Sequence, residues 1–464
     1  MDQLTTRAEP GSATAGAGTD RPTSGAAKRT GPATGGTGGS GEKGKSLRIL
    51  MLSWEYPPLV VGGLGRHVHA LATSLVAVGH DVTVVTRHAP GAPLDEVVEG
   101  VRVVRAPEDP PQFPLATPSL LAWTMAFNHT LTRAALRATA GDGAYDVIHA
   151  HDWLVTHTAV TLKEHLGVPL VATIHATEAG RHQGWLPEEM NKCIHSVEWW
   201  LAHEANRVLV CSEYMKWEVG KLWEPPLDRV EVIPNGVDDR AWSATPEDVA
   251  RARARLGGKG PLVGFAGRLV YEKGVQHLVG AIPQLRAEHP GLRVVISGDG
   301  PYRSELQEQA AKLRLGGSVT FTGFLNAGEL PAVLGATDAT VVPSLYEPFG
   351  MVALEAAAAG APLAVAATGG LAEIVQPGVN GVTFPHSDPG ALATAVGSLL
   401  ADRSGARRMV EHGRLVLRER YAWQSIATRT AAAYRRAGTA GSVGVKIGTL
   451  PQLSVPSGVN LLYA

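Results

Sequence analysis

Short apolar runs alternate with helix-length segments along most of this chain, and this alternation constrains the fold more than any other feature. The runs are rich in Val and Ile and too short to be buried helices, so they are typical of buried strands. Strands joined by helix-length connections run parallel, with helices on both faces of the sheet. In the first half the runs read "RILMLSWEY", "DVTVVTRH", "DVIHAHDW", "PLVATIHAT" and "RVLVCSEY". The sequence therefore predicts a doubly wound, Rossmann-like α/β domain.

The same alternation starts afresh after a hinge segment near residues 234 to 260. Its runs read "PLVGFAGRLVYEKG", "LRVVISGDG", "SVTFTGF", "ATVVPSLYEPFG" and "APLAVAATGG". Two such domains are expected to face a central cleft at the C-terminal ends of their strands, where open α/β sheets bind ligands. The predicted divisions are a disordered extension (1–46), two Rossmann-like domains (47–235 and 236–422), a helix crossing back to the first domain (423–437) and a tail (438–464).

Composition excludes several classes of protein. A chain of 464 residues with 44% hydrophobic residues can form two or three packed domains, and a net charge of -1 argues against a nucleic-acid-binding protein. Two cysteines, Cys193 and Cys211, fit a reducing compartment better than a disulfide scaffold. We find neither a signal peptide nor an apolar run long enough to span a bilayer. These features predict a cytoplasmic protein without a transmembrane segment.

The first 46 residues consist mostly of Gly, Ser, Thr, Ala and Pro, and they offer little to bury, so we expect them to be disordered. Within them "GSGEKGKS", residues 39–46, matches the phosphate-loop pattern G-x-x-x-x-G-K-S. A true phosphate loop follows a buried strand and opens a helix. Here the pattern follows predicted disorder and precedes a predicted strand, so we reject it as a nucleotide site.

Two strand-to-helix turns carry residues suited to an anionic ligand. In the first domain Gly62, Gly63 and Gly65 precede a helix, and their bare backbone can approach an anion, although a tight turn would use the same residues. In the second domain Arg268 and Lys273 lie between a strand and its helix. Arg can grip phosphate as a fork and Lys as a point charge. We expect them to hold a diphosphate, the alternative being a pair of solvated surface charges.

The stretch "EPFGMVALE" has a glutamate at each end, Glu347 and Glu355. Residues eight apart on a helix lie about 12 Å apart along its axis and roughly 80° around it. Paired glycosidase carboxyl groups lie about 5 to 5.5 Å or 6.5 to 9.5 Å apart, so this pair does not look like a hydrolase dyad. The alternative for Glu355 is a surface ion pair on its own helix, which the apolar neighbouring residues disfavour.

The motifs together resemble a known family, the retaining nucleotide-sugar glycosyltransferases of GT-B fold in glycosyltransferase family 4. The resemblance covers roughly residues 47 to 437 and rests on "GGLGRH", "TIHAT", "VIPNGVD", "GRLVYEKG", "GDGP" and "EPFGMVALE", in that order. The last looks like the family's E-x7-E motif. "SWEYPPLVVGGLGRHVH" and "IHATEAGRHQGW" look closest to glycogen-synthase-like α-1,4-glucosyltransferases, including the type that elongates methylglucose polysaccharides.

The resemblance implies a role for each matching residue. It places Glu347 near the donor sugar, Glu355 on the two ribose hydroxyls and His175 near the sugar's 6-hydroxyl and reacting carbon. Arg268 and Lys273 would stabilise the negative charge that develops on the leaving phosphate. The predicted catalytic residues are His175, Arg268, Lys273 and Glu347, the donor-binding residues are Gly62, Gly63, Asn235, Phe349, Gly350, Met351 and Glu355, and the acceptor-side residue is Asp152.

We expect no metal site and no cofactor. His149 and His151 in "HAHDW" are candidate metal ligands, but no third and fourth ligand follows at a suitable spacing, so structural histidines at a strand end are favoured. The ligands implied by the resemblance are a nucleotide diphosphate sugar, ADP-glucose or UDP-glucose, and an α-glucan or oligosaccharide acceptor. No nucleic-acid partner is expected.

The predicted function is retaining transfer of glucose from a nucleotide diphosphate to an α-glucan. The first alternative keeps the machinery with another sugar or acceptor, such as mannose onto a lipid or glucose onto a small molecule. A catalytically silent sugar-nucleotide- or glucan-binding protein would be expected to lack some of Arg268, Lys273, Glu347 and Glu355, and all four are present. A phosphorylase would need a pyridoxal-phosphate lysine site and usually a much longer chain.

Deleting residues 1 to 45 is expected to leave turnover and nucleotide affinity nearly unchanged, because this composition cannot build a binding site. Steady-state kinetics and calorimetry on the truncated chain check this. Loss of ATP or sugar-nucleotide binding on truncation would restore the phosphate-loop interpretation of residues 39–46.

Overall fold

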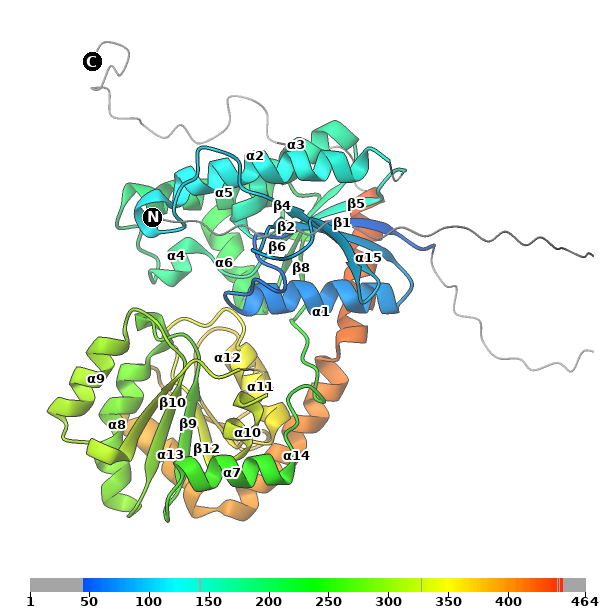
Figure 1. Ribbon diagram of the computed structural model, residues 1–464. Coiled ribbons are helices and arrows are strands. Elements are labelled where there is room, and N and C mark those ends of the chain that lie inside the picture. Colours follow the sequence, from blue (N-terminus) through cyan, green and yellow to red (C-terminus); the bar gives the residue numbers. More distant parts are fainter. Residues whose placement is uncertain (1–44, 142, 327, 440, 442, 445–464) are drawn as a thin grey trace, which may run out of the picture. The chain divides into compact units, whose positions relative to one another are not determined.

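The computed structural model describes residues 45–141, 143–326, 328–439, 441 and 443–444 (Figure 1). Most of the extension predicted as disordered, most of the 39–46 pattern and most of the predicted tail lie outside these residues. The pattern's last residue, Ser46, is followed by strand β1 (Arg48–Leu52) and not by a helix. No helix in the described ranges is long and apolar enough to cross a membrane.

An eight-stranded sheet forms the first half of the chain, in the order β3-β4-β2-β1-β5-β6-β7-β8. All neighbouring strands are parallel except β3 and β4. Its further strands are β2 (Asp81–Arg87), β3 (Asp95–Val98), β4 (Val101–Ala106), β5 (Val147–His151), β6 (Leu170–Ile174), β7 (Arg207–Val210) and β8 (Val230–Val232).

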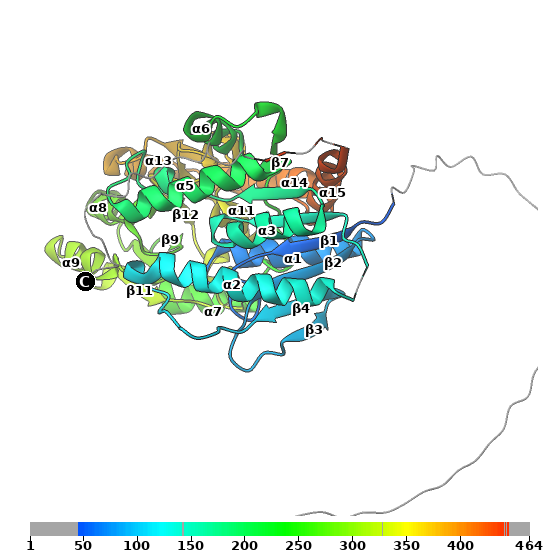
Figure 2. The same ribbon diagram turned by 90° about the horizontal axis from the view of Figure 1, so that it is seen from above.

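Helices cover both faces of this sheet (Figures 1 and 2). Alternate residues of β1 show why the strand is apolar throughout: Ile49 and Met51 pack with α1 and α15, whereas Leu50 and Leu52 pack in the cluster formed with α2, α3 and α5. The helices are α1 (Gly63–Ala77), α2 (Leu120–Thr139), α3 (Thr156–Leu166), α4 (Glu178–Arg181), α5 (Glu189–Glu204), α6 (Glu213–Trp223) and α15 (Trp423–Thr439), with short 3-10 turns at Thr117–Ser119, Trp153–Val155 and Leu227–Arg229.

A six-stranded, wholly parallel sheet forms the second half, in the order β11-β10-β9-β12-β13-β14. Its strands are β9 (Leu262–Ala266), β10 (Arg293–Ser297), β11 (Val319–Gly323), β12 (Ala339–Val342), β13 (Leu363–Ala366) and β14 (Val382–Phe384). Its helices are α7 (Pro246–Leu256), α8 (Val275–Glu288), α9 (Arg303–Lys312), α10 (Leu330–Gly335), α11 (Met351–Ala359), α12 (Leu371–Ile374), α13 (Pro389–Ala401) and α14 (Arg403–Arg420), with 3-10 turns at Tyr271–Lys273 and Gly316–Ser318.

Two features differ from the sequence-based expectation. The first sheet carries an antiparallel edge strand, β3. The alternation of strands and helices did not predict it, because β3 and β4 are joined only by Glu99 and Gly100. Both of these residues have positive φ, 52° and 79°, as a two-residue hairpin turn requires. The predicted hinge segment also contains a regular helix, α7, whose Ala252 and Leu256 pack against the second sheet.

Helix α15 returns to the first sheet after the second domain is complete, and it lies beside α1 (Figure 1). Its buried residues Ile426, Ala427 and Tyr434 join the core that contains Val68 and Leu71 of α1. These contacts lie within residues 423–437, the segment predicted to return to the first domain. The domain boundaries drawn at residues 235 and 422 remain predictions.

Among its parallel strands, each sheet reverses the direction of its strand order at one place, and these two places position the candidate site. In the first sheet the neighbours are β1 and β5, and in the second they are β9 and β12. Loops leaving the C-terminal ends of such neighbours diverge and form a crevice. The glycine loop follows β1, Asp152 follows β5, the cationic turn follows β9 and "EPFG" follows β12.

Candidate functional site

Glu347 lies in the loop between β12 and α11, held by groups of its own domain. Its Oε2 accepts hydrogen bonds from Lys273 Nζ at 2.7 Å and Ser344 Oγ at 2.9 Å, and the residue is buried. A buried carboxylate needs such a partner to remain charged. The structure therefore joins two predicted catalytic residues, Lys273 and Glu347, directly.

Glycine at position 274 makes this pairing feasible. Gly274 has a φ of 69°, and a Cβ there would lie 1.9 Å from the carbonyl oxygen of Pro343 at the end of β12. The turn also accepts a hydrogen bond from Leu345 N to Glu272 O at 2.8 Å. Only glycine permits this close approach of the cationic turn to the acidic loop.

Glu355 is buried in α11, with 2% of its surface exposed, so the alternative of a surface pair on its own helix is wrong. Its Oε1 pairs with Arg66 of α1 at 2.8 Å. Burial raises the pKa of Glu355, while the charge and hydrogen bond of Arg66 lower it and the charge of Glu347 raises it further. Arg66, from the first domain, thus favours the ionised form of Glu355 in the second domain. The sequence analysis did not predict this pairing.

The glycine loop after β1 already binds an anion of the chain itself. Glu55 accepts hydrogen bonds on Oε2 from the backbone N–H of Val61 and, at 3.1 Å, from that of Gly62. Gly65 lies against the same side chain, because a Cβ there would lie 3.2 Å from Glu55 Cδ. The loop can therefore hold a negative group, as predicted, but the N–H of Gly62 is engaged by Glu55. Nothing in the loop's glycine pattern pointed to this acid.

A further cation, Arg181, joins the predicted pair. It is exposed at the end of α4, and its charge lowers the pKa values of Arg268 and His175. Partial desolvation of the Arg268 guanidinium is the largest cause of its lowered pKa, Arg181 adds to the shift, and the charges of Glu272, Glu347 and Glu55 oppose it. Like charges gathered in one place favour an anionic ligand such as a diphosphate. The motif "IHATEAGRHQGW" contains Arg181, but sequence reasoning gave it no role.

His175 follows β6, and Asp152 holds its backbone. Asp152 Oδ1 accepts a hydrogen bond from the N–H of His175 at 2.7 Å. Burial raises the pKa of Asp152 to about 6, against the opposing effects of this hydrogen bond and of Arg181. Asp152 also has a φ of 60° and a ψ of 176°, a sparsely populated conformation for a residue other than glycine. This arrangement gives Asp152 a positioning task, while its predicted contact with the acceptor stays a proposal.

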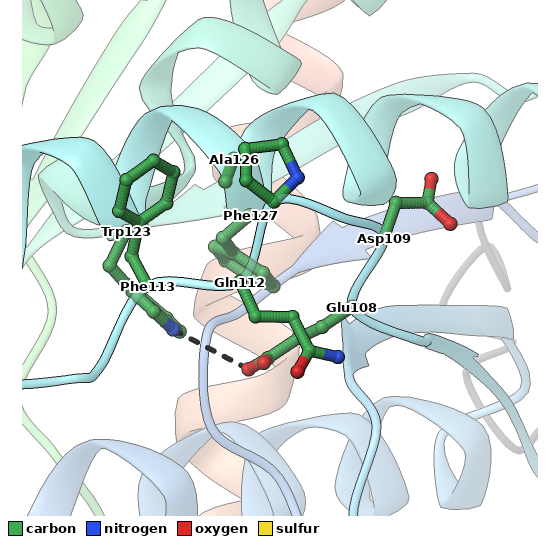
Figure 3. A pocket seen from close by; sticks show the side chains of 8 residues that line it. Glu108, Asp109, Gln112, Phe113, Trp123, Ala126 and Phe127 are labelled. Carbon is green, nitrogen blue, oxygen red and sulfur yellow. Dashed lines mark hydrogen bonds between the residues drawn. The ribbon is translucent and has the colours of Figure 1, made fainter.

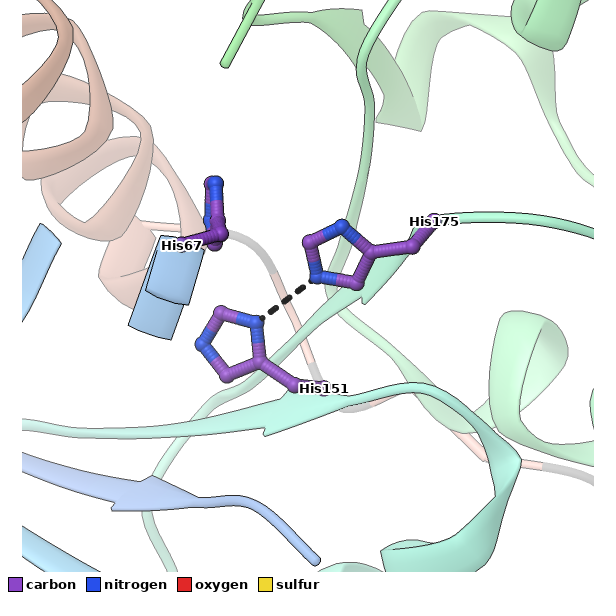
Figure 4. A group of neighbouring side chains, drawn as sticks. All are labelled: His67, His151 and His175. Atoms are coloured by element: carbon purple, nitrogen blue, oxygen red, sulfur yellow. Dashed lines mark hydrogen bonds between the residues drawn. The ribbon is translucent and has the colours of Figure 1, made fainter. Parts of the chain in front are cut away.

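The structure brings three histidines together from distant segments (Figure 4). His67 of α1, His151 at the end of β5 and His175 each offer a ring nitrogen, and these three atoms lie within 4.8 Å of one another. His151 Nδ1 and His175 Nε2 share a hydrogen bond of 3.1 Å. The sequence analysis expected no metal site because no further ligands follow His149 and His151 at a suitable spacing. Spacing along the chain cannot reveal three histidines that come together only in the folded protein.

The remaining predicted residues lie at the same end of the two sheets or in the core beside it. His149 is structural, as favoured from the sequence, since its ring nitrogens bond Tyr434 Oη and Thr173 Oγ1 at 2.7 Å each. Asn235 is buried beside His67. Phe349 packs edge-on against Tyr421, and Gly350, with a φ of 114°, leads into α11 at Met351.

Two hollows among the described residues lie away from these acids and cations. One is a small pocket on α2 and the preceding loop, where Trp123 Nε1 donates to Glu108 Oε1 at 3.4 Å (Figure 3). The other, of about 350 Å³, is lined by residues that include Ser212, Phe349 and Tyr421. Of the predicted site residues, only Phe349 borders either hollow, so neither one defines the candidate site.

Comparison with known proteins assigns the family. Residues 61–241 match Glycosyltransferase Family 4, and residues 247–416 match Glycosyl transferases group 1. Over 398 residues the chain is 46% identical to a glycogen synthase of Mycobacterium tuberculosis, covering 84% of this chain and 94% of that one. The chain belongs to the GT-B glycosyltransferases. The resemblance inferred from the motifs is thereby confirmed.

Two further comparisons agree with this assignment. The glycosyltransferase is 31% identical to an alpha-maltose-1-phosphate synthase of Mycolicibacterium smegmatis over 413 residues, covering 84% of this chain and 99% of that one. Its fold matches a sucrose-phosphate synthase from Thermosynechococcus elongatus with a TM-score of 0.73 and 27% identity, over 85% of this chain and 100% of that one. The two predicted Rossmann-like domains are therefore confirmed as a GT-B fold.

Proposed function

We propose that this glycosyltransferase transfers glucose from a nucleotide diphosphate glucose to the non-reducing end of an α-glucan, with retention of the anomeric configuration. The observation that carries the proposal is the paired arrangement of Lys273 with Glu347 and of Arg66 with Glu355 at the two ends of "EPFGMVALE". The 46% identity to a protein named glycogen synthase supports glucose and glucan as substrates.

In this proposal the cations hold the diphosphate. Arg268 and Lys273 lie on the turn after β9, and Arg181 approaches from the first domain. As the anomeric carbon–oxygen bond breaks, its electron pair moves to the leaving phosphate, and fixed cations stabilise the charge that develops there. Glu55 occupies part of the glycine loop, so Gly63 and the start of α1 remain as the donor-facing part of that loop.

The two acids receive separate tasks. Glu355 accepts the two ribose hydroxyls, since a carboxylate has about four lone-pair sites and Arg66 is bound to only one of its oxygens. Glu347, fixed by Lys273 and Ser344, lies beside the donor sugar together with Asn235 and the first N–H groups of α11. These assignments extend the predictions made from the motif.

The proposed transfer step is a front-face attack, as the resemblance to the family implies. The acceptor hydroxyl attacks the anomeric carbon on the face from which the diphosphate leaves, and the departing phosphate oxygen takes the hydroxyl proton. His175, whose pKa burial lowers to about 3, stays neutral and hydrogen-bonds the sugar without taking this proton. No residue needs to form a covalent intermediate in this scheme, and configuration is retained.

The donor nucleotide is proposed to be ADP or UDP, and no metal or cofactor is assigned to transfer. A cytoplasmic location is part of the proposal, supported by the free thiols of Cys193 and Cys211. The second candidate is transfer of glucose to a small phosphorylated sugar, which the 31% identity to an alpha-maltose-1-phosphate synthase favours.

A panel assay separates the two candidates. ADP-, UDP- and GDP-glucose and GDP-mannose are each offered with malto-oligosaccharides or with α-glucose 1-phosphate, and release of the nucleoside diphosphate is measured. Faster nucleoside diphosphate release from one glucose donor in the presence of malto-oligosaccharides supports transfer to a glucan. Release that requires glucose 1-phosphate would instead support transfer to a small phosphorylated sugar.

Replacing Arg66 by Gln is expected to weaken nucleoside diphosphate binding about three- to tenfold at pH 7, with a larger loss at pH 6 and a smaller one at pH 8. Arg66 lowers the pKa of buried Glu355, so its removal raises that pKa and leaves more of the acid protonated. A protonated Glu355 accepts poorly from ribose, and rising pH restores the ionised form. Calorimetry at three pH values measures the effect.

Arg133→Gln serves as the matched control, because Arg133 is an exposed residue of α2 that pairs with Asp109 in the loop before that helix. It should bind the nucleotide as the wild type does at each pH. An affinity for Arg66→Gln that does not change with pH would show that Arg66 does not act through the ionisation of Glu355.

A further inference from the structure

The three clustered imidazoles of His67, His151 and His175 are brought together by one domain. They come from the first turns of α1, the last residue of β5 and the residue after β6 (Figure 4). One nitrogen of each lies within 4.8 Å of the other two, and the rings of His67 and His175 approach to 4.7 Å between centroids. The cluster therefore does not depend on the position of the second domain's loops.

Two of these rings are buried without the hydrogen bonds that buried polar groups normally make. Within the described residues, both ring nitrogens of His67 and Nε2 of His151 lack a partner. The amide of Asn235 lies beside His67 without a hydrogen bond of ordinary geometry to it. His149, next to them, has both nitrogens satisfied. Three ring nitrogens of the cluster are thus buried without a hydrogen-bond partner among the described residues.

All three imidazoles are available in the form that binds metal ions. Burial lowers the pKa of each ring. Neighbouring histidines lower the pKa values of His67 and His151 further, and the charge of Arg181 lowers that of His175. Neutral imidazole is the ligating form, and three histidines with one open position make a familiar zinc ligand set.

We propose that His67, His151 and His175 form a site for a transition-metal ion of the zinc class, and that a bound ion withdraws His175 from the donor sugar and stops transfer. The second half of this statement rests on the proposed function. The ion replaces the hydrogen bond between His151 Nδ1 and His175 Nε2. Each ligating nitrogen gives its lone pair, and each neutral ring keeps its proton on the other nitrogen.

The site is present in an open form. Metal–nitrogen bonds of about 2.0 to 2.1 Å in tetrahedral geometry require nitrogens about 3.4 Å apart. His151 and His175 already meet this requirement at 3.1 Å, so His67 must close on them. The outer nitrogens of His67 and His151 lack the acceptors that orient most metal-bound imidazoles, so we expect roughly micromolar affinity.

Metal binding to the full chain tests the site without any activity measurement. Zn²⁺ titration by calorimetry and Co²⁺ titration by visible absorption should each give one ion per chain, with tetrahedral Co²⁺ bands. His67→Gln and His151→Gln should each weaken Zn²⁺ binding about ten- to a hundredfold or more. His69→Gln, on the same helix but paired with Glu99, should bind as the wild type does. Circular dichroism checks that every variant is folded.

Unchanged binding in His67→Gln, or equal loss in His69→Gln, would overturn the site. For the inhibitory effect, nucleotide release is compared with and without Zn²⁺ within each variant, so that the ratio is independent of basal rate. Wild type and His69→Gln should be inhibited and recover with chelator, whereas His67→Gln should not respond. Metal binding without inhibition would refute only the role of His175. Absence of transfer with every donor would refute the proposed function and leave the metal site standing.

Discussion

Replacing Arg268 or Lys273 by alanine should lower kcat/KM about a hundredfold or more, the loss that follows removal of one preorganised electrostatic donor. Both residues lie on the turn that Gly274 allows to approach the end of β12. The charges of Arg181 and Glu347 both affect the pKa of Arg268. In the proposed mechanism their charges face the position where the leaving diphosphate becomes negative. Steady-state rates with the preferred donor measure the effect.

A matched control is Arg286→Ala, at the far end of α8, the helix that begins after the same turn. It should leave kcat/KM unchanged. Because Lys273 also pairs with Glu347, the double variant Lys273→Ala with Glu347→Gln shows whether Lys273 has a second task. Losses of tenfold or less in both single alanine variants would remove these residues from the transition state.

The two glutamates should separate binding from turnover. Glu355→Gln should weaken both the free nucleoside diphosphate and the sugar nucleotide, about ten- to a hundredfold, because the ribose contact exists before and after transfer and is uniform binding. Glu347→Gln should lower kcat by a similar factor and leave nucleoside diphosphate affinity equal or slightly higher. The reason is that glutamine removes the negative charge that pairs with Lys273, so Lys273 can interact more strongly with the phosphate.

Calorimetry of the nucleoside diphosphate on both variants, beside their rates, measures this division. The glutamine variants keep the size of each side chain, so burial around α11 is little disturbed. Equal weakening by both substitutions, or weakening by Glu347→Gln alone, would show that the ends of "EPFGMVALE" are assigned wrongly.

The sequence predicted the two-domain fold well because parallel strands buried on both faces are apolar throughout, as Ile49 to Leu52 are. The sequence also places acids and cations in the loops after neighbouring strands, and the site predicted there stays a prediction. The antiparallel strand β3 escaped because a short hairpin at Glu99 and Gly100 interrupts the βα alternation.

The partners of the site residues could not be predicted in the same way. Arg66 meets Glu355, and Glu55 fills part of the glycine loop, only through tertiary packing. The three-histidine cluster likewise joins α1 to the ends of β5 and β6. A motif identifies which residue types a reaction needs, whereas the charges that neutralise them come from segments with no fixed spacing to the motif.

The central claim, retaining glucosyl transfer to a glucan, is tested most directly by the structure of the product. A malto-oligosaccharide is incubated with the full chain and with ADP-glucose or UDP-glucose, and the product is examined by chain-length analysis and by proton NMR of the new anomeric centre. We predict stepwise lengthening by single glucose units with new α-1,4 linkages. Lengthening through β linkages, or no lengthening with either donor, would contradict the account.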